Sequence, residues 1–333
     1  MTALLGVGLV TFVLVIVLLI LKHFFWTGRL KNVKNKHIVV TGGSSGIGKH
    51  VAITAAKHGA NVTIIARNVH KLEVARKEIL NARANKDEQM VEHLSLDIGA
   101  NYENVDKALA DLEKTMGPIY MLINCAGFAI PGKIEDLAVN SFHEMINVNL
   151  VGTYYCIKAV VQRMKAAGEG AIVITASQAA FLGIYGLAAY TSTKFALRGL
   201  AESLAMELRP YNISVTLSLP PDTDTPGYAT EQLTKPLETH LISQTAGLVD
   251  PEVVAEKLFK DARAGKFFST VGQEGFIMMT LCAGMSPFTS ISELLLQASL
   301  MGLMRLVSAF YLVSFQRIIL NCMKTRDKNK KLE

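Results

Sequence analysis

Two residues that can move a proton together, Tyr190 and Lys194, lie four positions apart in the sequence. On a helix this spacing places both side chains on one face. A lysine ammonium beside a phenol favours the phenolate and lowers the pKa of the tyrosine from its usual value of about 10. Such a tyrosine gives a proton to a carbonyl oxygen, or takes one from an alcohol, near neutral pH. The same spacing occurs on ordinary solvated helices, so the pair indicates catalysis only if the surrounding elements position it.

The chain around this pair alternates short apolar runs with helical patterns, which is typical of parallel α/β proteins. The predicted strands cover residues 36–41, 61–66, 91–96, 119–123, 170–175 and 213–219. The predicted helices cover residues 49–58, 101–116, 141–165 and 188–208. This order predicts a Rossmann-type, doubly wound parallel sheet with right-handed crossovers. Ligands of such sheets bind beyond the carboxyl ends of the strands, where the candidate residues fall.

A glycine-rich turn links the first predicted strand to the first predicted helix. Its sequence is Gly42-Gly43-Ser44-Ser45-Gly46-Ile47-Gly48. Glycines in such a turn let the backbone approach a pyrophosphate, and the helix N-terminus adds N–H groups and a partial positive charge. The turn therefore predicts a dinucleotide cofactor.

The end of the second predicted strand, Ala66-Arg67, indicates which dinucleotide binds. An acidic residue at this place binds the ribose hydroxyls of NAD, and here it is missing. The guanidinium of Arg67 is suited to bidentate contact with a phosphate, which favours NADPH through its 2′-phosphate. The alternative is a surface arginine that happens to follow a strand.

Length and composition limit the other classes of function. The 333 residues are enough for one large domain and additional segments. The basic excess behind the net charge of +6 lies near the two ends of the chain. A nucleic-acid binder would instead carry a basic stripe with aromatic residues between, so no nucleic-acid partner is expected. The four cysteines are far apart and form no CxxC, which predicts neither a metal site nor a disulfide framework.

The N-terminal segment reads as a transmembrane anchor over residues 1–25. Residues 2–21 carry no charge, and about twenty apolar residues cross the hydrocarbon core as a helix. The aromatic run Phe24-Phe25-Trp26 and the basic residues after it fit a cytosolic membrane face. The alternative is a cleaved signal peptide, but the basic residues follow the apolar run and no small-x-small site ends it.

The C-terminal region is apolar without forming a clean span. Residues 276–315 contain Gly284, Pro287 and Arg305. An arginine inside one long span is costly, which favours shallow association or a hairpin; two crossings and a hydrophobic dimer surface stay open. Residues 273–323 are therefore expected to associate with a membrane. Residues 324–333 form a charged tail whose lysines resemble a retrieval signal of the endoplasmic reticulum, or are simply frayed.

Taken together, these features resemble the short-chain dehydrogenase/reductase family over residues 36–272, the expected catalytic domain. The matching motifs are Thr41-Gly42 with Gly46 and Gly48, Asn124-Cys125-Ala126-Gly127, Asn149, Ser177, and Tyr190 with Lys194. Cys125 and Pro221 depart from the family's usual Asn and Gly. Ser45 stands where a basic residue is usual, so the 2′-phosphate assignment depends mainly on Arg67.

The resemblance implies a role for each matching residue. Tyr190 protonates the substrate oxygen, Lys194 lowers the pKa of Tyr190 and holds the nicotinamide ribose, and Ser177 polarises the carbonyl. Asn149 holds a water that links Lys194 to solvent. The implied cofactor-binding residues are Gly42, Ser44, Ser45, Gly46, Ile47, Gly48, Arg67, Lys71, Asp97, Asn124, Ala126, Gly127, Tyr190, Lys194, Pro220 and Thr225.

One branch of the family shares four further stretches with this chain, at residues 41–49, 220–227, 234–239 and 282–287. Members of that branch use NADPH to reduce a long-chain sphingoid ketone in sphingolipid synthesis, at the cytosolic face of the endoplasmic reticulum membrane. The resemblance implies the same reaction and contact with membrane lipids, and it leaves a homo-oligomer open. Glu231 and Glu238, in the family's substrate lid, are candidates to meet the substrate ammonium.

Two other functions compete with this one. The first is a microsomal reductase that acts on a steroid or retinoid ketone or alcohol. The second is an inactive membrane scaffold that keeps the nucleotide-binding fold. The presence of Ser177, Tyr190 and Lys194 argues against the scaffold.

Overall fold

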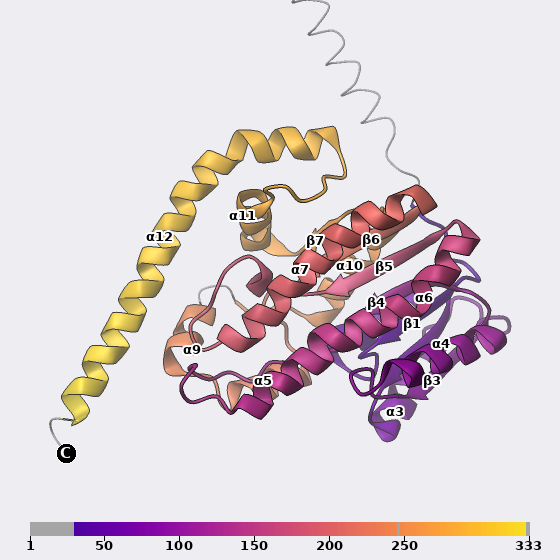
Figure 1. The fold of residues 1–333 in the computed structure, drawn as a ribbon, viewed down its shortest axis with the longest axis horizontal. Coiled ribbons are helices and arrows are strands. Elements are labelled where there is room, and N and C mark those ends of the chain that lie inside the picture. The colour runs from indigo at the N-terminus through magenta and orange to yellow at the C-terminus, as the bar shows by residue number, and fades with distance from the viewer. Residues whose placement is uncertain (1–29, 245–246, 331–333) are drawn as a thin grey trace, which may run out of the picture.

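Seven short runs rich in β-branched and apolar residues form one parallel sheet with the strand order β3-β2-β1-β4-β5-β6-β7 (Figure 1). The strands are β1 (His37–Thr41), β2 (Asn61–Ala66), β3 (Val91–Ser95), β4 (Ile119–Asn124), β5 (Gly170–Thr175), β6 (Ile213–Leu219) and β7 (Phe268–Thr270). The computed structural model describes residues 30–244 and 247–330. The predicted anchor at residues 1–25 and the tail residue Lys331 lie outside the described residues.

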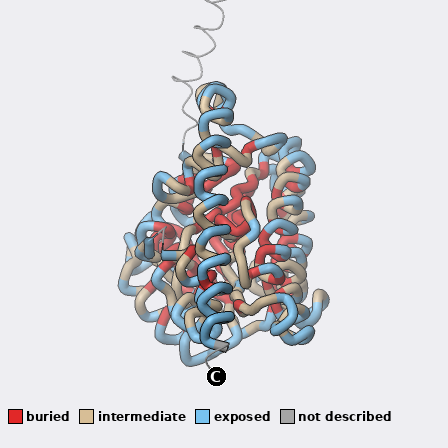
Figure 2. The backbone as a smooth tube through the Cα atoms, turned by 90° about the vertical axis from the view of Figure 1, so that its left-hand side faces the viewer, coloured by how far each residue is buried: buried red, intermediate tan, exposed pale blue. Residues whose placement is uncertain are grey.

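Helices cover both faces of this sheet, which confirms the predicted doubly wound architecture. The covering helices are α2 (Gly46–Lys57), α3 (Val69–Asn81), α4 (Tyr102–Met116), α6 (Thr153–Ala167), α7 (Ala188–Leu208) and α10 (Pro251–Arg263). Alternate residues of β1 enter opposite layers, because successive strand side chains point to opposite faces. Val39 packs on the side of α4, α6 and α7, whereas Ile38 and Val40 pack on the side of α2, α3 and α10. Figure 2 shows these buried strands between exposed helices.

The strand order reverses between β1 and β4. From β1 the chain moves outward through β2 and β3, then returns to β4 on the other side of β1. The connections on the two sides of this point therefore diverge and leave a crevice beyond the carboxyl ends of the strands. The predicted cofactor turn follows β1, and the Asn124-Cys125-Ala126-Gly127 motif begins at the end of β4.

The helix predicted at residues 141–165 is irregular at its centre. It consists of α5 (Val139–Met145), a π-helical segment (Ile146–Gly152) and α6. Asn149 lies inside the π-helical segment. Such π-turns inside α-helices are frequent at functional sites, because they shift the register of the side chains that follow.

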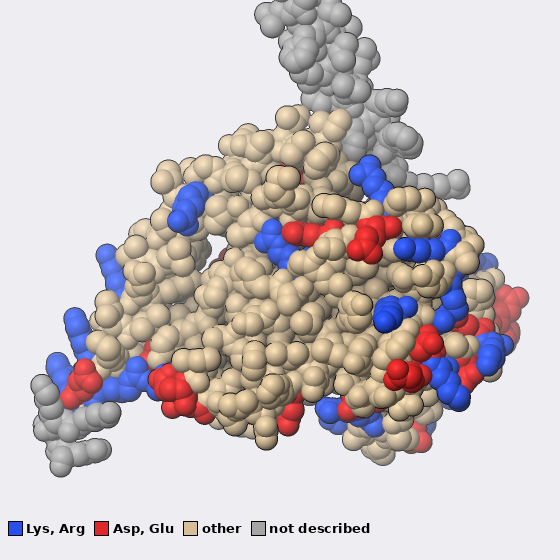
Figure 3. Space-filling view, viewed as in Figure 1, with Lys and Arg blue, Asp and Glu red and all other residues tan. Residues whose placement is uncertain are grey.

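The C-terminal region adds α8 (Pro226–Gln232) and α9 (Leu237–Ser243) over the crevice, and α11 (Gly272–Cys282) and α12 (Ile291–Lys330) beside it. Of the alternatives for this region, a hairpin that turns at Arg305 does not form, because α12 continues through this residue. Arginine is a good helix former, and its side chain is exposed here. Within the described part of the chain, α12 is the one helix long and apolar enough to cross a membrane. Figure 3 shows its charged side chains gathered mainly toward its C-terminal end.

Candidate active site

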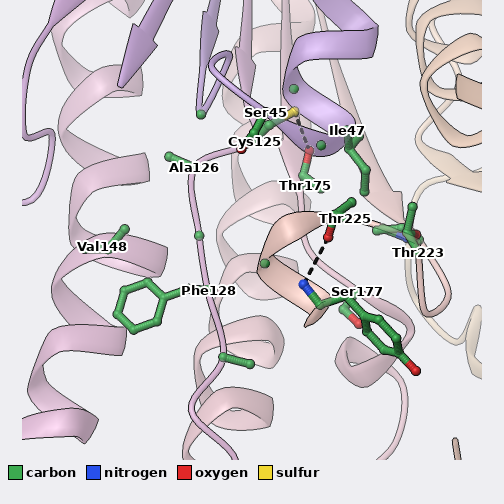
Figure 4. A pocket seen from close by; sticks show the side chains of 18 of the residues that line it. Ser45, Ile47, Cys125, Ala126, Phe128, Val148, Thr175, Ser177, Thr223 and Thr225 are labelled. Carbon is green, nitrogen blue, oxygen red and sulfur yellow. Dashed lines mark hydrogen bonds between the residues drawn. The ribbon is translucent and has the colours of Figure 1, made fainter. Parts of the chain in front are cut away.

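A cavity of about 470 Å³ opens at the carboxyl ends of the central strands. It brings together most of the residues that the sequence singled out, from segments far apart in the chain. The predicted residues that line it are Gly42, Ser44, Ser45, Gly46, Ile47, Gly48, Arg67, Lys71, Asp97, Ala126, Gly127, Ser177, Tyr190, Lys194, Pro220 and Thr225. Figure 4 shows Ser45 and Ile47 of the glycine turn, Ala126 and Phe128 after β4, and Ser177 and Thr225 around this space.

The glycine turn fits a dinucleotide because its backbone packs against neighbouring backbone so closely that a side chain has no room. Only glycine can occupy these positions, and the bare backbone can then approach a pyrophosphate. Gly42 has a φ of +68°, and a Cβ on it would lie 2.7 Å from the nitrogen of Ala126. A Cβ on Gly48 would lie 2.4 Å from the carbonyl oxygen of Gly42. Ser45, the N-cap of α2, makes no side-chain capping bond, so the first N–H groups of α2 are available to an anionic ligand.

The far end of the cavity carries the positive charge expected for a 2′-phosphate. Arg67 and Lys71 both line it. The Arg67 side chain is 68% exposed, and its Nη1 lies 4.0 Å from Oδ2 of Asp97. An exposed ion pair at this distance contributes little, so the Arg67 guanidinium can bind a phosphate without losing a strong partner.

Three of the predicted catalytic residues, Ser177, Tyr190 and Lys194, meet at the other end of the cavity. Ser177 follows β5, and its Oγ accepts a hydrogen bond of 3.1 Å from the backbone nitrogen of Ala179, which fixes the hydroxyl. Lys194 is 4% exposed, and its Nζ lies 5.4 Å from the centroid of the Tyr190 ring. The same Nζ donates a hydrogen bond of 3.1 Å to the carbonyl oxygen of Thr175. The segment after β5 and the helix α7 thus bring Ser177, Tyr190 and Lys194 together.

One expectation about this pair is not met: the pKa of Tyr190 is raised and not lowered. Burial raises the pKa of the Tyr190 phenol, the charge of Glu231 raises it further, and the hydrogen bond with Ser177 opposes the shift. Burial also lowers the pKa of Lys194 to about 8. The ammonium lies over the ring and donates to a backbone carbonyl, so its charge is not directed at the phenol oxygen. Tyr190 is therefore protonated at neutral pH, the state that a proton donor needs.

Two predicted residues do not line the cavity. Asn124 is 2% exposed and donates from Nδ2 to the carbonyl oxygen of Val173 at 3.2 Å, so it links β4 to β5. Asn149 is fully buried. Its Oδ1 accepts from the Phe128 nitrogen at 3.0 Å, and its Nδ2 donates to the Phe128 carbonyl and to Oγ1 of Thr193. Both amides thus hold backbone behind the cavity wall.

Cys125, which replaces the family's usual Asn, does line the cavity. Its Sγ lies 3.2 Å from Oγ1 of Thr175, as the dashed line in Figure 4 shows. Burial raises the pKa of the Cys125 thiol to about 11, so the thiol stays protonated and unreactive at neutral pH. No group of three or more His, Cys, Asp or Glu side chains that could hold a metal ion occurs among residues 30–244 and 247–330.

The two acids proposed for an ammonium differ in their surroundings. Glu238 is 2% exposed and forms an ion pair with Arg326 of α12, and it does not line the cavity, so that expectation is wrong. Glu231 does line the cavity, and its carboxylate lies 2.9 Å from Nζ of Lys235. Asp222 also faces this space; it was missed, although it lies in the 220–227 stretch that the resemblance had marked.

Comparisons with known proteins agree with this geometry. The short chain dehydrogenase family matches residues 36–235. The chain is 48% identical to a 3-ketodihydrosphingosine reductase of Bos taurus over 292 residues, which is 88% of each chain. It is also 48% identical to a 3-dehydrosphinganine reductase of Danio rerio, over 294 residues and again 88% of each chain.

A solved structure extends the match to three dimensions. A short-chain type dehydrogenase/reductase from Mycobacterium ulcerans superposes with a TM-score of 0.64 and 27% identity, covering 72% of this chain and 89% of that one. Proteins of this family use a nicotinamide cofactor, and the cavity described above has the glycine turn and the Ser, Tyr and Lys side chains that the family requires. The chain therefore belongs to the short chain dehydrogenase family, and its relatives of high identity are 3-ketodihydrosphingosine reductases.

Proposed function

We propose that the protein reduces 3-ketodihydrosphingosine to dihydrosphingosine with NADPH, a step of sphingolipid synthesis. The observation that carries the proposal is one cavity that joins the glycine turn to Ser177, Tyr190 and Lys194. The substrate is taken from relatives that are 48% identical over 88% of the chain. NADPH is preferred to NADH because Arg67 and Lys71 line the end of the cavity where an acid would otherwise bind the ribose.

The side chains divide the work of ketone reduction between them. The glycine turn, Arg67 and Lys71 would hold NADPH, which would supply the hydride for the carbonyl carbon. The Ser177 hydroxyl, held by Ala179, donates a hydrogen bond to the carbonyl oxygen and stabilises the charge that develops there. The Tyr190 phenol then transfers its proton to that oxygen, which completes the alcohol. Lys194, 5.4 Å from the centroid of the Tyr190 ring, orients the ribose.

A substrate panel separates this proposal from its alternatives. The purified protein in detergent micelles would be given NADPH with 3-ketodihydrosphingosine, a steroid ketone or retinal. The proposal predicts oxidation of NADPH with the sphingoid ketone at a kcat/KM well above the other two. Turnover of only the steroid or the retinoid would favour the microsomal reductase, and no turnover of any ketone would favour an inactive scaffold.

Arg67→Asp is expected to shift the cofactor preference toward NADH. The change removes the phosphate partner and places an acid near the ribose, where an acid binds the hydroxyls of NAD. A hydrogen bond to a charged group contributes about 1.5–3 kcal/mol, so the ratio of kcat/KM for NADPH to that for NADH should fall about tenfold to a hundredfold. Arg209→Asp, an exposed arginine outside the cavity, is the control. An unchanged ratio in the Arg67 variant would remove this residue from the cofactor site.

We further propose that the protein works at the cytosolic face of the endoplasmic reticulum membrane, with α12 along the membrane surface. The 40 residues of α12 span about 60 Å as a helix. The side chains of Leu303, Leu306 and Phe310 on α12 are more than half exposed. Near its C-terminal end, Arg326 pairs with Glu238 of α9. Because this ion pair holds the C-terminal end of α12 against the catalytic domain, α12 fits shallow association with the membrane better than a crossing.

A truncation tests the membrane proposal in two parts. The protein lacking residues 1–30 should stay on membranes after extraction with alkaline carbonate, because the apolar face of α12 remains. A tag at the C-terminus should be digested by protease added to intact vesicles, since the tail is on the cytosolic side. A fully soluble truncated protein would make the N-terminal segment the sole anchor, and a protected tag would place the tail in the lumen.

A further inference from the structure

A second cavity, of about 350 Å³, lies between the catalytic domain and the C-terminal helices. It adjoins the first cavity, because Ser177, Ile184 and Pro220 line both. Figure 3 shows the surface hollowed between α12 and the domain, with mostly uncharged side chains around it. A molecule bound at Ser177 can therefore extend away from the nicotinamide end into this space.

The walls of the second cavity are mostly apolar. One wall comes from α11, with Ile277, Met278 and Leu281, and the floor from the segment after Ser177, with Phe181 and Leu182. The charged exceptions are Glu274, Arg305 and Asp222, the last of which also lines the first cavity. Burial raises the pKa of Glu274, which favours its uncharged form, and Arg305 lies 3.3 Å from the Ser308 hydroxyl, to which it donates.

The outer wall comes from one face of α12. Arg305, Ser308, Leu312 and Phe315 line the cavity, and their spacing of three and four places them on one side of a helix. Leu306, which is 71% exposed, lies on the opposite side. Thus α12 separates the cavity from the surroundings of the protein, with apolar side chains on both of its faces.

Both helical walls are fastened to the catalytic domain. Arg198 of α7 donates to the carbonyl oxygen of Cys282 at 2.8 Å and to Oγ of Ser286 at 2.9 Å, which holds the end of α11. A Cβ on Gly275 would lie only 2.0 Å from Oγ1 of Thr270, so the start of α11 is pressed against β7. At the other end of the cavity wall, the ion pair of Arg326 and Glu238 ties α12 to α9.

We infer that this cavity binds the alkyl chain of the substrate. A chain dissolved in the membrane passes α12, the outer wall of the cavity, to reach Ser177 and Tyr190. The inference builds on the proposed function, which sets a carbonyl at Ser177 with a long alkyl chain on one side of it. Among the spaces that open from the site, the second cavity has the apolar lining that such a chain requires. The amino alcohol end then remains on the side of Asp222 and the nicotinamide.

Kinetics with two chain lengths test the inference. Ser308→Trp places a large side chain in the cavity, and Leu306→Trp places the same side chain on the outer face as a control. A buried methylene contributes about fourfold in affinity, so Ser308→Trp should lower kcat/KM for the long-chain ketone about tenfold or more. Its kcat/KM for a short-chain 2-amino-3-keto analogue should stay within about twofold of wild type. Equal losses for both chain lengths, in a protein that still binds NADPH, would overturn the inference.

Photocrosslinking of the unmodified protein gives an answer that does not depend on a variant folding. The probe is the long-chain ketone with a diazirine at the end of its alkyl chain, in the presence of NADP⁺. Labelling of Ser308, Leu312 or Phe315, suppressed by excess unlabelled substrate, is the expected result. Labelling confined to Leu306 and its neighbours on the outer face would mean contact with dissolved lipid only, and would contradict the inference. Absence of turnover with both chain lengths would instead refute the proposed function.

Discussion

Tyr190→Phe is expected to lower kcat for ketone reduction about a hundredfold to ten-thousandfold, the range that a positioned general acid contributes. The substitution removes the Tyr190 hydroxyl, which forms a hydrogen bond with Ser177 in the cavity, and keeps the ring. NADPH should bind with a Kd within a few-fold of that of the wild-type protein, because the glycine turn and Arg67 are untouched. Stopped-flow measurement of NADPH oxidation, with a separate fluorescence titration of NADPH, gives both quantities.

Tyr154→Phe is the matched control, because Tyr154 is an exposed tyrosine of α6 outside the cavity. This variant should retain the wild-type rate. If Tyr190→Phe kept more than a few per cent of the wild-type kcat, the proton would come from another group. The assignment of Tyr190 would then be wrong, whatever the substrate.

Gly48→Ala is expected to destabilise the protein and to weaken NADPH binding together. The new Cβ would lie 2.4 Å from the carbonyl oxygen of Gly42, which is backbone and has no side-chain freedom with which to yield. Overpacking of this kind costs about 1–3 kcal/mol, and each kcal/mol lowers Tm by about 2–4 °C in a domain of this size. Movement of Gly42 away from Ala126 also opens the turn that receives the pyrophosphate.

Gly199→Ala serves as the control for this second prediction. Gly199 lies in α7, and a Cβ there would meet nothing within 4 Å; alanine also favours a helix over glycine. This variant should therefore match or slightly exceed the wild-type Tm and bind NADPH normally. A Gly48→Ala protein with unchanged Tm and unchanged Kd for NADPH would show that the turn relaxes freely.

Much of the fold was predictable because its signals are local. The strand–turn–helix at Gly42 to Gly48 and the spacing of Tyr190 and Lys194 each depend on a short stretch of sequence. The first six strands could be identified as short apolar runs. The seventh, Phe268–Thr270, has only three residues, too few for a periodic pattern, and it forms because β6 offers an open edge.

The electrostatics of the site could not be predicted in the same way. The pKa of Tyr190 depends on how deeply folding buries the phenol and on Glu231, which is far along the chain and arrives with α8. The same holds for Asn149, whose partners Phe128 and Thr193 come from two other segments. A motif identifies these residues, but their contacts are set by the tertiary structure.

The position of the C-terminal helix also could not be predicted from a local pattern. Arg305 favoured shallow association or a hairpin, because a charge is costly inside a membrane span. In the structure α12 lies against the catalytic domain, and Arg305 reaches Ser308 beside the second cavity. The charge of Arg305 therefore affects the position of α12 relative to the catalytic domain, and it does not interrupt the helix.

The central claim is hydride transfer from NADPH to the ketone carbon of the sphingoid substrate, and isotope transfer tests it most directly. The purified protein would be incubated with 3-ketodihydrosphingosine and NADPH deuterated at the transferred position of C4. The product analysed by mass spectrometry should be dihydrosphingosine with one deuterium, bound to the carbon that carried the ketone. Unlabelled product, or no conversion of this ketone while NADPH still binds, would contradict the account.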